Sequence, residues 1–221
     1  MADDPTTTDI EDTYSGHAPA DTKPTTRERA AIDSARVSEG EPARRGLVTL
    51  PPIRFVQTPN CSSRNGKRVE GVVVHETEGG YYGAVGWLTR KDVQASAHVV
   101  LKEDGSEATQ LVPWGEKAWH AAGANPHTLG IEIAGFTGGA KMQNNDAQIR
   151  RAARICGYWC ERFDIPPVHK MDGHNGLTRH RDLGAFGGGH HDPGGFDWDE
   201  FVAMVAAEVE RGSFRPQWGE D

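Results

Sequence analysis

The sequence lacks any hydrophobic run long enough to cross a membrane. Its longest apolar stretches, such as residues 72–74 and 201–207, fall far short of the roughly 20 residues that a spanning helix needs. A secretory signal is also missing, because Asp3 and Asp4 stand where basic residues would precede an apolar stretch. We therefore expect a chain that is made in the cytoplasm and stays there unless another agent releases it.

The chain also has few cysteines and fewer basic than acidic residues. The cysteines, Cys61, Cys156 and Cys160, make neither an even disulfide framework nor a paired zinc knuckle, so reduced thiols are expected. The 24 Lys and Arg residues are outnumbered by 32 Asp and Glu residues, which gives a formal net charge of -8. Nonspecific binding of nucleic acid depends on clustered basic residues, so this acidic chain indicates no nucleic-acid partner.

Aromatic residues are almost absent from the N-terminal part of the chain, where Tyr14 stands among many Thr, Asp, Glu and Pro residues. Such a segment has little apolar surface to offset the entropy of ordering. We predict a disordered acidic tail at residues 1–46, with room for a short helix at 26–36. Further along, apolar segments alternate with glycine-rich turns. We expect one folded domain at residues 47–211 and a short C-terminal tail at residues 212–221.

Hydrophobic periodicity indicates both strands and helices within the domain. β-branched residues run together before His75, and a long helical pattern ending at Phe163 leaves several arginines on its wet side. Asp197 stands before the last periodic segment as a helix N-cap. The predicted strands lie at residues 69–75, 97–101, 109–112 and 130–134, and the predicted helices at 83–89, 145–163 and 198–211. This mixture predicts a single α/β domain.

The 10 histidines are more than packing usually needs, and several lie beside glycines or at the ends of predicted strands. His75 ends an apolar strand, while His180 and Asp192 lie in loops, where functional residues are common. Two neutral imidazoles and one carboxylate bind zinc tetrahedrally and leave a fourth position for water, which the ion makes more acidic. The spacing of these three residues matches no compact metal motif. From the residues alone, structural roles for the histidines remain the alternative.

Several motifs occur together in the order typical of one enzyme family. They read VQASAHVV (93–100), DG (104–105), QLVP (110–113), KAWHAAG (117–123) and LGIEI (129–133), followed by His180, Asp192-Pro193-Gly194, Phe196 and Trp198. Over roughly residues 70–205 the chain resembles the type-2 N-acetylmuramoyl-L-alanine amidases. This family includes bacteriophage endolysins, cytosolic muropeptide-recycling amidases and animal peptidoglycan-recognition proteins.

The resemblance implies a single domain with a central mixed sheet flanked by helices. It also implies a zinc-dependent hydrolase, which cleaves the amide bond between the lactyl group of N-acetylmuramic acid and the L-alanine of the stem peptide. The zinc ligands of the family fall on His75, His180 and Asp192. His190 or His191 in place of Asp192 remains an alternative, because the choice rests on the match to the Asp-Pro-Gly motif.

Two further residues are implied to act in catalysis. Glu132 falls where recycling amidases keep a glutamate that takes a proton from the attacking water and passes it to the leaving nitrogen. Other members use a tyrosine before the histidine of the Ser-Ala-His strand, and Ala97 stands there in this chain. His190 replaces a lysine that stabilises the oxyanion in many members. Because imidazole loses its charge near roughly pH 6.5, we expect weaker activity at alkaline pH than in lysine-bearing relatives.

Three residues are implied to line the substrate groove. Trp119 and His120 belong to the family's Ala-Trp-His-Ala-Gly segment, and Asn125 follows it. Core packing is the alternative for the indole, which is more often buried than stacked on a sugar. His98 is expected to be a hydrogen-bonded core residue.

The resemblance favours a bacteriophage endolysin that hydrolyses peptidoglycan for host lysis. Such an enzyme would accumulate in the host cytoplasm without a signal peptide and reach the cell wall after release by a holin. We expect a monomer whose partner is bacterial peptidoglycan. The alternatives are a cytosolic muropeptide-recycling amidase, a noncatalytic peptidoglycan-binding module and a zinc-free structural protein.

Overall fold

The computed structural model describes residues 48–49, 53–137, 145–211 and 214–215. The predicted acidic tail at residues 1–46, with its short helix, lies outside them. Most of the predicted C-terminal tail lies outside them too, but β10 (Phe214–Arg215) pairs in parallel with β1 (Val48–Thr49). The first and last described segments therefore meet in a two-stranded sheet that the sequence did not indicate.

A mixed sheet of six strands forms the centre of the domain, in the order β2-β6-β5-β8-β4-β9. Its strands are β2 (Arg54–Phe55), β6 (Ala108–Gln110), β5 (Val99–Leu101), β8 (Thr128–Ile133), β4 (Gly71–Glu76) and β9 (Gly176–Arg179). β4 lies between the parallel partners β8 and β9, whereas β5 and β6 form the predicted antiparallel hairpin. Beside this sheet, β3 (Cys61–Ser63) pairs with β7 (Glu116–Ala118) in antiparallel fashion. The predicted single α/β domain with a mixed sheet is confirmed.

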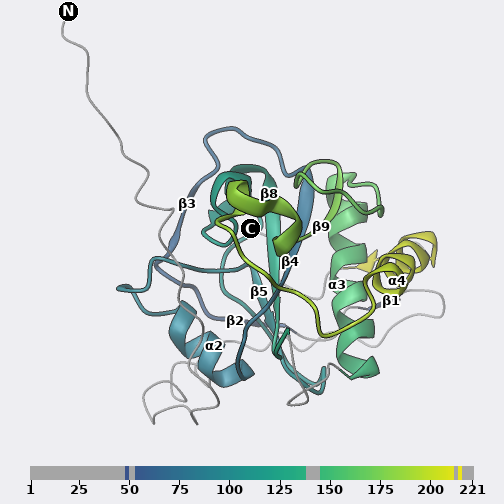
Figure 1. Ribbon diagram of the computed structural model, residues 1–221, viewed down its shortest axis with the longest axis horizontal. Coiled ribbons are helices and arrows are strands. Elements are labelled where there is room, and N and C mark those ends of the chain that lie inside the picture. Colours follow the sequence, from purple (N-terminus) through teal and green to yellow (C-terminus); the bar gives the residue numbers. More distant parts are fainter. Residues whose placement is uncertain (1–47, 50–52, 138–144, 212–213, 216–221) are drawn as a thin grey trace, which may run out of the picture.

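Helices flank the sheet on both sides (Figure 1). α3 (Asp146–Phe163) and α4 (Trp198–Arg211) pack together on one side, and α2 (Tyr81–Leu88) lies on the other. The chain also forms two 3-10 helices, η2 (Ala122–His127) and η3 (His180–Gly187). The carboxylate of Asp197 accepts a hydrogen bond from the amide of Glu200 at 2.9 Å, so the predicted N-cap of α4 is confirmed.

Alternation along β4 decides which face of the sheet can carry chemistry. Val72 and Val74 lie in the large hydrophobic cluster that includes residues of α3 and α4. Val73 packs instead with Leu183 and two alanines in a separate cluster. Because successive side chains of a strand point to opposite faces, His75 shares the face of Val73 and points away from α3.

The strands and helices predicted in the domain are present, with ends shifted by a few residues. α2 begins at Tyr81, earlier than predicted, because Gly80 before it is extended and the amide of Tyr81 donates to the Glu103 carboxylate at 2.7 Å. The sequence did not indicate β2, β3, β7, β9 or the 3-10 helices. These segments are too short to carry a hydrophobic period, and β9 depends on the hydrogen-bonding edge that β4 offers it.

The sequence led us to expect reduced thiols and no membrane-spanning helix. Cys61, Cys156 and Cys160 are free thiols, the last two buried on α3. Within the described ranges, each helix is too short or too polar to cross a bilayer.

Candidate metal centre

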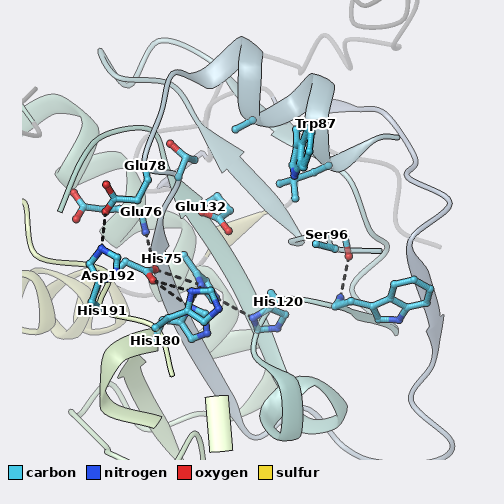
Figure 2. A pocket seen from close by; sticks show the side chains of 16 residues that line it. His75, Glu76, Glu78, Trp87, Ser96, His120, Glu132, His180, His191 and Asp192 are labelled. Carbon is cyan, nitrogen blue, oxygen red and sulfur yellow. Dashed lines mark hydrogen bonds and ion pairs between the residues drawn. The ribbon is translucent and has the colours of Figure 1, made fainter. Parts of the chain in front are cut away.

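Three potential metal ligands from separate parts of the chain converge near the end of β4 (Figure 2). His75 belongs to β4, His180 opens η3, and Asp192 follows in the next loop. His75 Nδ1 lies 2.9 Å from His180 Nδ1 and 3.6 Å from Asp192 Oδ2. His180 Nδ1 lies 3.3 Å from Asp192 Oδ1. The three residues are only 2%, 3% and 5% exposed, so most of their surface is packed against the rest of the protein.

The donor set and its spacing fit zinc. A tetrahedral zinc ion with bonds of about 2.0–2.2 Å keeps its ligand atoms about 3.3 Å apart. The separations of 2.9, 3.3 and 3.6 Å bracket this value. Two imidazole nitrogens whose lone pairs face each other also repel, and a cation between them removes that repulsion. The geometry of His75, His180 and Asp192 is therefore that of a site that can hold a divalent ion.

The neighbouring histidines are less suited to be the third ligand. His190 Nδ1 lies 3.7 Å from Asp192 Oδ1, and its ring stacks on that of His180 with 4.1 Å between centroids. His191 points toward Glu78, with 3.7 Å from Nε2 to Oε1, and 62% of its side chain is exposed. The geometry favours Asp192 as the ligand and leaves His190 as a side chain that faces the same pocket.

The surroundings of His75 and Asp192 set the protonation of both groups. Burial, together with the neighbouring His180 and His120, holds the pKa of His75 well below its usual range, so its ring is neutral. Burial by itself would raise the pKa of Asp192, but its contact with His180 and the hydrogen bond from the Glu76 amide lower it overall. A neutral imidazole and an ionised carboxylate are the forms that bind metal ions.

Glu76 fixes the loop that carries Asp192. Its Oε2 accepts hydrogen bonds from the amides of Gly194 and Gly195 at 2.7 and 3.0 Å and from Thr137 Oγ1 at 2.9 Å. The Glu76 amide donates to Asp192 Oδ2 at 3.2 Å. The sequence analysis missed this residue, although a carboxylate directly after His75 on an apolar strand was a signal. Glu76 is thus the link between β4 and the third ligand.

A cluster of charged side chains orients the turn that carries His180. Arg179 Nη2 donates to Asp182 Oδ1 at 2.8 Å, and His169 Nε2 lies 2.8 Å from Asp182 Oδ2. His180 Nε2 donates to the carbonyl oxygen of Gly187 at 2.8 Å. Since a carbonyl can only accept, Nε2 carries the proton of the neutral ring and Nδ1 keeps the lone pair that a metal needs.

Glu132 lies beside the metal centre on the neighbouring strand. It is the register partner of His75, so both side chains leave the sheet on the same face. Its Oε2 is buried and has no hydrogen-bond partner among the described residues. Burial, followed by the charges of Asp192 and Glu76, raises the pKa of Glu132 well above its usual range. A carboxyl group of this kind in a pocket is a candidate proton carrier, and its catalytic role stays a prediction.

A pocket opens over these groups, and Figure 2 shows Trp87 of α2 across it from His180. Its lining residues are His75, Glu76, Thr77, Glu78, Ala84, Trp87, Leu88, Ala95, Ser96, Trp119, His120, Glu132, His180, His190, His191 and Asp192. Trp119 is partly exposed and is held by hydrogen bonds from its Nε1 to Ser62 Oγ at 3.0 Å and from its amide to Ser96 Oγ at 2.9 Å. An indole fixed in this way can present its face to a ligand.

Asn125 and His98 support the pocket from outside its lining. Asn125 is 1% exposed, and its Oδ1 accepts hydrogen bonds from the amides of His120 and Ala121 at 2.9 and 2.6 Å. This placement suits support of the His120 segment better than direct contact with a substrate. His98 is fully buried, with Nδ1 accepting from the Gly130 amide at 2.9 Å, as expected for a core histidine.

Family comparison agrees with this geometry. The model of the N-acetylmuramoyl-L-alanine amidase family, Amidase_2, matches residues 65–195, which include all three candidate ligands and Glu132. The matched segment is more than half of the chain, and the chain belongs to this family.

Curated relatives match over part of their length. N-acetylmuramoyl-L-alanine amidase A of Achromobacter lyticus is 26% identical over 155 residues, which are 62% of this chain and 84% of the relative. The 1,6-anhydro-N-acetylmuramyl-L-alanine amidase AmpD of Salmonella typhimurium is 31% identical over 124 residues, which are 52% of this chain and 59% of AmpD. The similarity to AmpD therefore spans less than two thirds of that protein.

Solved structures show the same fold. The hydrolase AmiA of Staphylococcus aureus, determined in complex with its ligand, has a TM-score of 0.61 at 19% identity and covers 80% of this chain and 95% of its own. A mutant endolysin from Bacillus subtilis has a TM-score of 0.53 at 18% identity and covers 72% of this chain and 99% of its own. At these identities the likeness concerns the fold alone.

Proposed function

We propose that this chain is a zinc-dependent peptidoglycan amidase that hydrolyses the bond between N-acetylmuramic acid and the L-alanine of the stem peptide. The observation that carries the proposal is the convergence of His75, His180 and Asp192 at the floor of a pocket that Glu132 also lines. Membership of the amidase family supports the bond that is cleaved. An intact ligand set disfavours a noncatalytic binding module.

His75, His180 and Asp192 would hold the ion, through two nitrogen atoms and one carboxylate oxygen. A bound zinc ion supplies a Lewis acid that polarises an amide carbonyl and makes water a better nucleophile near neutral pH. The ring of His75 stays neutral in this arrangement, and His180 turns the lone pair of Nδ1 toward the site. Asp192 adds one negative charge, which leaves the site with a net positive charge toward an anionic transition state.

Glu132 would carry the proton of the reaction. Its unpartnered oxygen and raised pKa suit a group that accepts a proton from the attacking water and then gives it to the departing alanine nitrogen. Because His75 and Glu132 are register partners, the base lies on the same face of the sheet as the ligand set.

His190 would stabilise the oxyanion. Its ring lies against His180 and lines the pocket, and 19% of its side chain is exposed, so it can reach a bound carbonyl. Donation from an imidazole to a developing negative charge lowers the barrier as a lysine would. Trp119 and His120, which also line the pocket, would contact the glycan and peptide. Asn125 would act there by holding the backbone of His120.

The biological setting that we propose is host lysis by a bacteriophage endolysin. In this setting the chain acts as a monomer on bacterial peptidoglycan, after a holin opens the cytoplasmic membrane. Its catalytic domain occupies residues 47–211. The fold that it shares with the Bacillus subtilis endolysin is compatible with this proposal. Similarity to AmpD favours the second candidate, a cytosolic amidase that recycles small muropeptides.

Digestion of purified peptidoglycan tests the proposal. Zinc-loaded protein should release free L-alanine amino termini that mass spectrometry detects, and chelator-treated protein should not until zinc is returned. His180→Ala should abolish the product, while His174→Ala, which changes a partly exposed histidine outside the pocket, serves as the matched control. New reducing sugar ends would instead identify a glycosidase and contradict the proposal.

The choice between the two settings needs a second substrate. Intact sacculi and soluble anhydro-muropeptides should be compared at equal molar concentrations of cleavable bonds. An endolysin solubilises sacculi, whereas activity confined to the small fragments would replace host lysis with recycling.

A further inference from the structure

His120 contacts His75 at the ring nitrogen that does not face the other two candidate ligands. His75 Nε2 lies 2.9 Å from His120 Nδ1, whereas the other ring nitrogen of His75 faces His180 (Figure 2). His120 Nε2 in turn lies 3.3 Å from Thr128 Oγ1. The Thr128 hydroxyl donates to the carbonyl oxygen of Ala124 at 2.8 Å. A continuous hydrogen-bond chain therefore joins the backbone of η2 to the first ligand.

The direction of this chain follows from its last acceptor. A carbonyl oxygen has no proton to give, so Thr128 must donate to Ala124, and its own oxygen is left to accept from His120. A neutral His120 then carries its proton on Nε2 and offers a lone pair on Nδ1. His75 donates a hydrogen bond from its Nε2 to that lone pair. The lone pair on Nδ1 of His75 then faces the other two ligands.

The backbone around His120 is arranged for an imidazole in this position. Asn125 Oδ1 accepts from the amides of His120 and Ala121 and so fixes the segment that carries the ring. A Cβ atom on Gly130 would lie only 2.6 Å from His120 Nδ1. Any side chain at position 130 would therefore displace the nitrogen that receives the proton of His75.

We propose that His120 and Thr128 are positioning residues, which fix the tautomer and the ring orientation of His75 through the hydrogen-bond chain that ends on Ala124. The proposal rests on the metal site of the proposed function and adds to it two residues that do not touch the metal. His180 needs no such chain, because its Nε2 donates directly to the carbonyl of Gly187. Removal of such outer partners typically weakens metal binding roughly ten- to hundredfold.

Zinc affinity, measured by competition with a chromophoric chelator, gives the first test. Thr128→Val removes the hydroxyl and keeps the shape of the side chain, and His120→Phe removes both ring nitrogens. We expect His120→Phe to weaken zinc binding roughly ten- to hundredfold and Thr128→Val to weaken it toward the lower end of that range. Thr128→Ser, which keeps the hydroxyl, and His174→Phe, outside the pocket, should stay within about twofold of the wild type.

The tautomers themselves give a second test that needs no metal. In ¹⁵N NMR spectra of the metal-free protein, His75 and His120 should both carry their proton on Nε2. In Thr128→Val, the proton of His120 should redistribute toward Nδ1, because its acceptor is lost, and in Thr128→Ser it should stay on Nε2. A merely structural role for Thr128 would leave these signals unchanged.

The outcomes separate this proposal from the proposed function. Wild-type protein that binds zinc tightly, with unchanged affinity in both disruptive variants or with Nδ1 protonated on His75, overturns the positioning chain and leaves the amidase intact. Wild-type protein that binds no zinc refutes the metal site, and the tautomers of the metal-free protein then decide whether the chain exists. Should Thr128→Val fail to fold, the wild-type spectra decide alone.

Discussion

His75 and Glu132 stand opposite each other on the parallel strands β4 and β8, with paired Cα atoms and side chains on one face. The face is the one turned away from α3, because Val72 and Val74 occupy the other. A candidate ligand and a candidate base are thus held by the backbone of a single sheet. Their relative position depends on strand register rather than on a loop.

Replacement of Glu132 by glutamine should abolish proton transfer without disturbing the ligands. We expect kcat to fall by roughly a hundredfold or more, since general acid–base groups contribute about 10²–10⁴ in rate. Zinc affinity should change little, because Glu132 is not one of the converging donors. Glu161→Gln, on the exposed side of α3, is the matched control. Retention of full activity in Glu132→Gln would remove this residue from the mechanism.

The same substitution should stabilise the metal-free protein at neutral pH. Burial raises the pKa of Glu132, and a carboxyl group with a raised pKa stabilises the fold only while it is protonated. That contribution is complete below the unfolded pKa of about 4.3 and is lost as the pH rises through the raised value. Chelator-treated Glu132→Gln should therefore melt above the wild type at pH 7, and the difference should shrink toward pH 4.

Thermal unfolding of both proteins in a chelator, across pH 4 to 8, measures this effect. Glu161→Gln should follow the wild type throughout. A melting temperature of Glu132→Gln that lies below the wild type at pH 7 would show that the carboxylate has a stabilising partner, contrary to its buried and unpartnered oxygen.

Glu76 should matter for metal binding although it is not a ligand. Its carboxylate holds the amides of Gly194 and Gly195, and hydrogen bonds to a charged acceptor are roughly twice as strong as neutral ones. Glu76→Gln should loosen the loop of Asp192 and weaken zinc affinity about tenfold, as measured by chelator competition. Thr137→Val removes one of the same contacts and should have a smaller effect. Equal affinities in all three proteins would show that Asp192 is held by other contacts.

The two adjacent histidines of the loop should behave differently on truncation. His190 faces the pocket against His180, whereas 62% of the His191 side chain is exposed beside Glu78. We expect His190→Ala to lower kcat roughly hundredfold with little change in KM, as removal of an oxyanion donor does. His191→Ala should remain within about twofold of the wild type, and His190→Lys should restore much of the rate. If both alanine variants lost a similar factor in kcat, the cause would be a disturbed loop conformation rather than a lost contact between His190 and the oxyanion.

Local pattern was sufficient to predict the elements that hold the site. The apolar run before His75 and the helical period of α3 are recorded in consecutive residues, so β4 and α3 could be predicted from sequence alone. Period-2 alternation also allows Glu132 to be placed on one face once the pairing of β4 with β8 is known. That pairing itself is long-range and needed either the structure or the family resemblance.

The supporting contacts could not be predicted from local pattern. Glu76 binds the amides of Gly194 and Gly195, which lie far along the chain, and His75 meets His120 only because Gly130 leaves room for the ring. The start of η3 depends on a charged cluster rather than on an apolar period. Such contacts leave no spacing in the sequence that hydrophobicity or helix propensity can detect.

β4, like β8, is bonded along both edges by parallel neighbours, and all of its residues are buried. A segment of this kind exposes its amides to solvent only when the surrounding sheet opens, so deuterium should enter it late. The loop around Asp192 relies instead on a few side-chain contacts and should take up deuterium early. On heating, Asp192 would therefore leave the site while His75 is still held by the sheet, and a bound ion would be lost before the sheet itself melts.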